Sequence, residues 1–219
     1  METLLKIPYK AFNEDWDLLQ QFLERRGNPR YELVGDVRLR SRKGIYDLGN
    51  LVRIYGGLIL TFSSIQSLGN LEYVGGYLDL RGTPIESLGN LEYVGGHLDL
   101  DETQIKSLGN LEYVGGNLDL LKTPIELLGN LEYVGGYLDL RKTPIQSLGN
   151  LVRVEGNLSL EYTQIQSLGN LEYVGINLDL RYTPIKSLDN LKYVGDTIYL
   201  TDDSEIPEEQ LIKFKFNYD

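Results

Sequence analysis

The chain has 219 residues, a formal net charge of −11 at neutral pH, no cysteine and a single histidine. The lack of cysteine excludes a disulfide framework, a zinc–thiolate centre and a cysteine nucleophile, and the acidic charge argues against direct binding to nucleic acid or anionic membranes. The chain contains no 18-residue apolar run that could span a membrane, and it does not start with a secretory signal, so we expect a cytoplasmic protein. We also expect no cofactor and no metal ion.

A helix is predicted over residues 13–26, near the start of the chain. Asn13 is the expected N-cap, acidic residues follow it in the first turn, and Gly27 ends the helix. The apolar stripe of this helix consists of Trp16, Leu19 and Leu23. We expect the stripe to cover the exposed end of the repeats that follow.

From residue 65 to residue 194 the sequence repeats every 20 residues, and one unit over 77–96 reads YLDLRGTPIESLGNLEYVGG. A fixed period of this length is typical of a solenoid, in which each unit stacks on its neighbours. Leu78 and Leu80 alternate with polar residues and predict a short strand. The remaining apolar positions of the unit are Ile85, Leu88, Leu91 and Val94. The spacing of three among the last of these predicts a 3₁₀-like turn or a tight arc. Twenty residues leave no room for a full outer helix, so the outer side should be thin.

The pattern Leu-x-Leu-x-x-Thr-x-Ile-x-x-Leu, over about 45–200, resembles the leucine-rich repeat family. The resemblance implies an α/β repeat solenoid that is right-handed, with parallel strands in register. The segment Asn-Leu-Glu-Tyr-Val-Gly-Gly is also similar to the repeat of growth-factor-receptor L domains, which implies a second short strand at 93–94 in place of the 3₁₀ turn. Both alternatives stay open. The near-identical copies further resemble repeat arrays of bacterial, phage and giant-virus proteins.

We predict a single domain over 1–219, with an N-terminal helical cap at 1–33, about eight 20-residue repeats at 34–203 and a C-terminal cap at 204–219. Pro207 favours a short helix that runs to about residue 212. Phe214 and Phe216 alternate beyond it and are expected to cover the edge of the last coil.

Two polar positions recur in almost every unit. One column consists of Thr83, Thr103, Thr123, Thr143, Thr163 and Thr183. The other consists of Asn50, Asn70, Asn90, Asn110, Asn130, Asn150, Asn170 and Asn190. We expect both to hydrogen-bond backbone groups at turns. The alternative for the threonines is a flat ice-binding ladder, which one Thr per coil supports poorly.

The strand face carries a column of carboxylates, Asp79, Asp99, Asp119, Asp139 and Asp179. In-register like charges repel, so this column needs an explanation. Three are open: recent duplication of one unit, a binding face for a basic protein segment, or a row for divalent cations, to which one carboxylate per coil contributes few ligands. Arginines that partly neutralise the column are Arg81, Arg141 and Arg181.

Positions on and beside this face vary while the core positions hardly change. A recognition surface would show this variation, and so would unconstrained solvated positions. The expected anchors, besides the arginines, are Tyr77, His97, Tyr137, Tyr162 and Tyr182. A second tyrosine column consists of Tyr73, Tyr93, Tyr113, Tyr133, Tyr173 and Tyr193, interrupted by Arg53 and Arg153. We expect it to cover turn backbone through ring contacts, with a contact site for a partner or a second copy as the alternative.

No catalytic constellation is present, and His97 is expected to be a solvated surface residue. The sequence therefore predicts a non-enzymatic protein that binds a partner protein with a basic surface, without direct contact to nucleic acid or membrane. Two alternatives are an acidic nucleic-acid mimic that inhibits a DNA- or RNA-binding protein, and a self-assembling structural protein.

Overall fold

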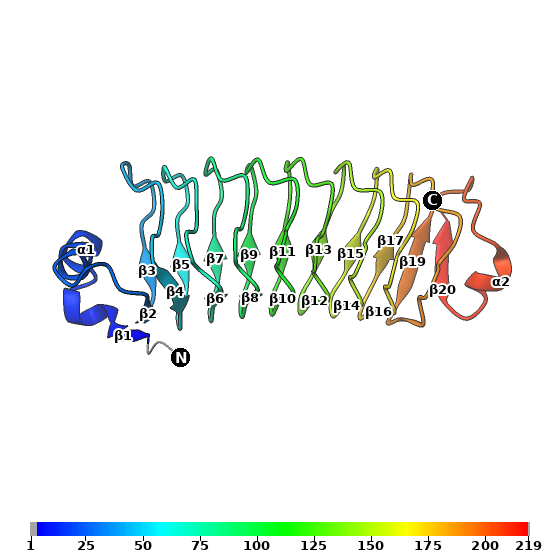
Figure 1. The fold of residues 1–219 in the computed structure, drawn as a ribbon. Helices are drawn as coiled ribbons and strands as arrows, with labels where there is room; N and C mark the ends of the chain where they lie inside the picture. The colour runs from blue at the N-terminus through cyan, green and yellow to red at the C-terminus, as the bar shows by residue number, and fades with distance from the viewer. Residues whose placement is uncertain (1–3, 219) are drawn as a thin grey trace.

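Two parallel β-sheets run the length of the molecule and are wound from successive coils of one chain (Figure 1). The structure is a computed structural model that describes residues 4–218. The first sheet contains β1 (Leu5–Pro8), β2 (Tyr31–Val34), β4 (Leu51–Ile54), β6 (Tyr73–Val74), β8 (Tyr93–Val94), β10 (Tyr113–Val114), β12 (Tyr133–Val134), β14 (Arg153–Val154), β16 (Tyr173–Val174) and β18 (Tyr193–Val194). The second contains β3 (Val37–Arg38), β5 (Leu58–Ile59), β7 (Leu78–Asp79), β9 (Leu98–Asp99), β11 (Leu118–Asp119), β13 (Leu138–Asp139), β15 (Leu158–Ser159), β17 (Leu178–Asp179), β19 (Thr197–Leu200) and β20 (Lys215–Tyr218).

Residues twenty apart pair directly across neighbouring coils. Leu118 lies opposite Leu98 on one side and Leu138 on the other, and the pairing is parallel throughout the repeats. The result is a parallel, in-register β-solenoid of about nine turns with few helices. Each repeat contributes a strand to both sheets. Of the two alternatives for 93–94, the structure therefore shows the second short strand and not the 3₁₀ turn.

The apolar core occupies the space between the sheets. In the central coil the six apolar positions are at most 2% exposed; they are Leu118, Leu120, Ile125, Leu128, Leu131 and Val134. Equivalent residues of the other coils extend the same core over the length of the solenoid. The predicted leucine columns are therefore confirmed as the interior.

The glycines of each repeat serve two different purposes. Gly109 adopts a left-handed conformation with φ of +60°, which a residue without Cβ reaches at no steric cost. Gly115 lies at the corner between the sheets, where a Cβ would come within 2.2 Å of the carbonyl oxygen of Gly95. Close stacking of the coils therefore favours glycine at this corner, and a positive φ does not. Two coils carry another residue there, Tyr55 and Glu155.

The threonine column bonds backbone groups as predicted. The Thr123 hydroxyl donates to the carbonyl of Leu120 at 2.6 Å, and the same bond recurs in the other repeats. Five of the six threonines are buried, which rules out a flat threonine ladder for ice. In the asparagine column Asn50, Asn110, Asn150 and Asn190 do so, whereas the Asn70 amide donates to the Asn50 side chain. The Asn190 side-chain amide donates to the carbonyl of Gly169 in the preceding coil, at 3.0 Å.

The N-terminal helix is shorter than predicted. Helix α1 spans Trp16–Glu24, and the side chain of Asp15, not that of Asn13, accepts two backbone N–H bonds of its first turn. Asn13 instead ends a 3₁₀ helix at Tyr9–Phe12. Asn13 and Glu14 both have positive φ, which is incompatible with the predicted start at residue 13. The predicted stripe of Trp16, Leu19 and Leu23 is buried in the same core as the first coils.

The C-terminal segment follows the prediction closely. Helix α2 spans Glu208–Leu211 after Pro207, and β20 then pairs with β19 so that Phe216 lies opposite Ile198. The Gln210 side chain also accepts the backbone N–H of Leu188 at 2.8 Å. Residues 1–3 and 219, with which the predicted caps begin and end, lie outside the described residues.

Within residues 4–218, no helix has both the length and the apolar character needed to cross a membrane.

Replacement of one interior leucine should destabilise the solenoid far more than replacement of an outward leucine in the same coil. Leu118 is 0% exposed and Leu121 is 38% exposed. We expect Leu118→Ala to lower the free energy of unfolding by about 2–5 kcal/mol, and Leu121→Ala to change it by less than about 0.5 kcal/mol. Chemical denaturation checks both variants; equal effects would contradict the assignment of the interior.

Candidate protein-binding surface

The aspartates of the second sheet hydrogen-bond the backbone of the turn that follows each strand, a role that the sequence analysis missed. Each carboxylate accepts the backbone N–H two residues later, where the chain turns out of the strand. These bonds join Asp79 to Arg81 at 3.2 Å, Asp99 to Asp101 at 3.1 Å, Asp119 to Leu121 at 3.1 Å, Asp139 to Arg141 at 3.1 Å and Asp179 to Arg181 at 3.1 Å. Aspartate commonly closes a turn in this way, and the Asp-Leu-x-x-Thr spacing was the available signal.

Three of the five aspartates are also neutralised within their own coil. Carboxylate–guanidinium distances are 2.7 Å for Asp79–Arg81, 2.6 Å for Asp139–Arg141 and 2.8 Å for Asp179–Arg181. These bidentate ion pairs reduce the repulsion between stacked carboxylates. The three arginines are thus occupied inside the chain, although each stays accessible to solvent.

Asp99 and Asp119 belong to coils without such an arginine. Asp99 contacts the Nε of Arg81, from the previous coil, at 3.1 Å, and Asp119 accepts a hydrogen bond from the Tyr137 hydroxyl at 3.4 Å. Burial raises the pKa of Asp99 to about 6, assisted by the neighbouring carboxylates and opposed by Arg81. Burial also raises the pKa of Asp101, which lies beside it. Negative charge without an arginine from the same coil is therefore concentrated around 99–119, where Asp99 shares Arg81 with Asp79.

The predicted anchors lie in two rows that flank the aspartates. Tyr77, His97 and Tyr137 occupy the row two positions before them, where exposed His97 accepts the backbone N–H of Asn117 on its Nδ1 at 2.8 Å. Tyr162 and Tyr182 occupy a turn three positions after the aspartate position, and their rings stack at 4.5 Å. The structure thus places all predicted residues on one face but does not join them into one cluster.

The turn row contains a backbone feature that the sequence did not reveal. Its members share a left-handed conformation, with φ between 55° and 60° for the residues other than glycine; they are Phe62, Gly82, Glu102, Lys122, Lys142, Tyr162 and Tyr182. This conformation costs roughly 1–2 kcal/mol for a residue with a Cβ. The equivalent cost is avoided at the other left-handed position of the repeat, which is glycine in all coils from Gly49 to Gly169.

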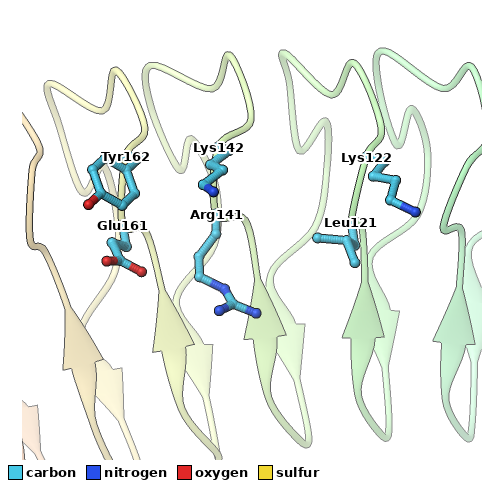
Figure 2. Close-up of a pocket in the computed structure, with 6 residues that line it drawn as sticks. All are labelled: Leu121, Lys122, Arg141, Lys142, Glu161 and Tyr162. Atoms are coloured by element: carbon cyan, nitrogen blue, oxygen red, sulfur yellow. The ribbon is translucent and has the colours of Figure 1, made fainter.

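A recess of about 550 Å³ lies along this row (Figure 2). It spans three coils and is lined by Leu121, Lys122, Arg141, Lys142, Glu161 and Tyr162. The recess forms where Leu121 replaces the longer arginine found in other coils. Sequence reasoning missed this recess because it depends on the sizes and directions of side chains from three coils, which the repeat period does not fix.

The second tyrosine column forms a stacked ladder on the first sheet. The rings of Tyr73, Tyr93, Tyr113 and Tyr133 follow one another at 4.7–4.8 Å and lie within 5° of parallel. Where Arg153 interrupts the column, its guanidinium lies 3.5 Å from the ring centre of Tyr173. The ladder supports the expected structural role of these side chains.

The divalent-cation alternative gains no support from the geometry. No group of three or more His, Cys, Asp or Glu side chains in the described part of the chain is arranged to hold a metal ion. Neighbouring aspartates are engaged by turn backbone and arginine instead.

Equivalent Asp→Asn changes in two neighbouring coils should have opposite effects on stability. The Asp99 pKa is raised above its usual 3.8, so ionised Asp99 costs stability at pH 7, and Asp99→Asn should raise the free energy of unfolding by about 1–2 kcal/mol. Burial opposes ionisation of Asp79 too, but hydrogen bonds from Arg81 outweigh it and lower the pKa, so Asp79→Asn should cost about 1 kcal/mol.

The pH dependence of the unfolding free energy distinguishes the raised pKa of Asp99 from the lowered pKa of Asp79. The gain in Asp99→Asn should be complete above pH 6 and disappear towards pH 4, as native Asp99 takes up its proton. The loss in Asp79→Asn should persist down to about pH 4 and fade below it. Urea denaturation between pH 3.5 and 8 measures both, and effects of the same sign at pH 7 would refute the asymmetry.

Comparison of the chain with models of known protein families, with curated proteins and with solved structures gave no match.

Proposed function

We propose that this protein is a non-enzymatic binding solenoid, whose second-sheet face recognises a partner protein with a basic patch. The observation that supports this most is the pair Asp99 and Asp119, two carboxylates without an arginine in their own coils. Asp99 has to share Arg81 with Asp79, so a lysine or arginine of the partner would add a cation to this part of the column. The cost of ionising Asp99 would then be recovered on binding, which gives the site a preference for cationic groups.

Aromatic side chains next to these carboxylates provide the apolar part of the contact. Tyr137 is 38% exposed, and its hydroxyl already reaches Asp119 at 3.4 Å. Tyrosines of this kind combine contact area with a hydrogen-bonding tip, and they can also face a cation. We infer that Tyr137 and His97 border the basic segment, while the more distant Tyr162 and Tyr182 contact another part of the partner.

The distribution of charge weighs against the nucleic-acid mimic. A mimic needs closely and regularly spaced anions, since duplex DNA carries about one negative charge per 1.7 Å. Here three of the five aspartates are bound to arginines, so the row is broken into unequal parts.

We infer the finer features of the fold in the same way. Right-handed winding and membership of the leucine-rich repeat family follow from the resemblance of the repeat. A capping role for α1 and for the C-terminal segment is supported by their positions at the two ends in Figure 1 and by the buried stripe of α1. Caps of this kind would oppose end-to-end self-assembly. A single cytoplasmic domain of bacterial or viral origin remains our proposal.

Hexalysine is a suitable probe for the acidic site. At low ionic strength it should shift the backbone amide resonances of 97–101 and 117–121, with an affinity that falls as salt is added. Asp99→Asn/Asp119→Asn should weaken binding at least five-fold, because Asn keeps the turn bond but removes the charge. Binding to the unaltered chain should also weaken from pH 7 to pH 5 as Asp99 is neutralised.

The matched control is Asp139→Asn/Asp179→Asn, which changes the net charge by the same amount but removes carboxylates whose arginines do not contact Asp99 or Asp119. We expect its affinity to change less than two-fold. Equal weakening by the two double variants would mean that hexalysine responds only to net charge, and the proposed site would be refuted.

A further inference from the structure

The turn row keeps side chains in a conformation where glycine would be unstrained. Lys122, Lys142 and Tyr162 all have φ between 57° and 59°. Gly82 shows that the same turn accepts glycine, and a Cβ at this position would come within 2.4 Å of the Phe62 ring. Strained backbone that persists in several coils indicates that the side chains themselves are needed.

The recess beside these residues is lined by an apolar side chain, Leu121, and by an aromatic one, Tyr162. Figure 2 shows Leu121, Arg141 and Tyr162 on three successive coils, where they line the recess. Leu121 is 38% exposed and Tyr162 is 47% exposed. At about 550 Å³, the space is larger than one side chain, and it suits an apolar or aromatic side chain together with a neighbouring group.

The cationic side chains of the recess differ in whether a carboxylate of this chain already pairs with them. Lys122 forms an ion pair with Glu102 at 2.7 Å, and Arg141 forms one with Asp139 at 2.6 Å. Within the described residues, Lys142 has no carboxylate within 4.0 Å; its ammonium lies 5.7 Å from the centre of the Tyr162 ring. The carboxylate of Glu161 also lines the recess, but it pairs with Arg181 at 4.0 Å, so the Lys142 ammonium is complementary to a carboxylate of a ligand.

We propose that this recess binds an acidic segment of the partner protein, with an apolar or aromatic side chain between Leu121 and Tyr162 and a carboxylate on Lys142. The inference rests on the proposed function, because it assigns the recess to the same partner. It adds a second site of opposite charge preference, two coils beyond Asp99. The partner would then present basic and acidic groups in a fixed order along the solenoid axis.

Short peptides test the recess without the partner. N-acetyl-Glu-Trp-Glu-amide should shift the backbone amides of 121–122, 141–142 and 161–162 in NMR spectra, with an affinity at least five-fold above that of the Gln-Trp-Gln and Lys-Trp-Lys analogues. Lys142→Gly and Tyr162→Gly should each weaken binding at least five-fold. Glycine is the correct truncation here, because alanine would keep the strained conformation.

Two controls lie outside the recess. Phe62→Gly relieves the same left-handed backbone conformation in another coil, and Lys186→Gln removes a lysine that is paired with Glu205. We expect each to change the affinity less than two-fold, and thermal melting verifies that every variant is folded. The proposal is overturned if the acidic peptide shifts no amide of the recess, if the lysine analogue binds equally well, or if either control weakens binding as much as Lys142→Gly. Failure of hexalysine binding with retained recess binding would overturn only the acidic site.

Discussion

In-register stacking of coils twenty residues apart is the constraint on which every other feature of this molecule depends. Backbone pairing places equivalent residues opposite each other, as Leu98, Leu118 and Leu138 show. Whatever side chain the unit carries is therefore repeated in a straight row at about the strand spacing of 4.8 Å. This favours leucine, which fills a continuous core. It also favours tyrosine, since the rings of Tyr93 and Tyr113 stack at 4.7 Å without any adjustment of the backbone.

The same constraint makes a row of carboxylates costly, and the structure shows why it nevertheless persists. Asp79 and its equivalents close the turn that follows the strand, so each coil needs an acceptor at this position. Repulsion is then reduced from outside the column by arginines two residues later. Where the arginine is replaced, as by Asp101 after Asp99, the carboxylate keeps its turn bond but lacks a cation from its own coil. Small differences between coils thus convert a uniform scaffold into a surface with distinct sites.

The fold was largely predictable from the sequence, because inward and outward positions are set by a period that any coil displays. The buried stripe of Trp16, Leu19 and Leu23 and the packing of Phe216 on the last coil follow from such patterns. The strand at 93–94 was one of two alternatives that the pattern left open. Features that depend on backbone angles did not follow. Asn13 is a good N-cap in isolation, but its positive φ transfers this role to Asp15. The recess escaped prediction because it depends on the size and direction of side chains on three successive coils, from Leu121 to Tyr162, which the repeat period does not fix.

Comparison of the two left-handed positions in each repeat separates scaffold from variable surface. Both positions have the same backbone requirement, yet one is glycine in coil after coil, from Gly49 to Gly169, whereas the other carries Glu102, Lys142 or Tyr162. Recent duplication explains why the cores are alike, but it does not explain why variation is concentrated at a position where most side chains are strained. Relaxed selection would tolerate glycine there as readily as lysine. The retention of charged and aromatic side chains against this strain is therefore an argument that the turn row contacts something, and that its sequence of residues along the axis determines what it contacts.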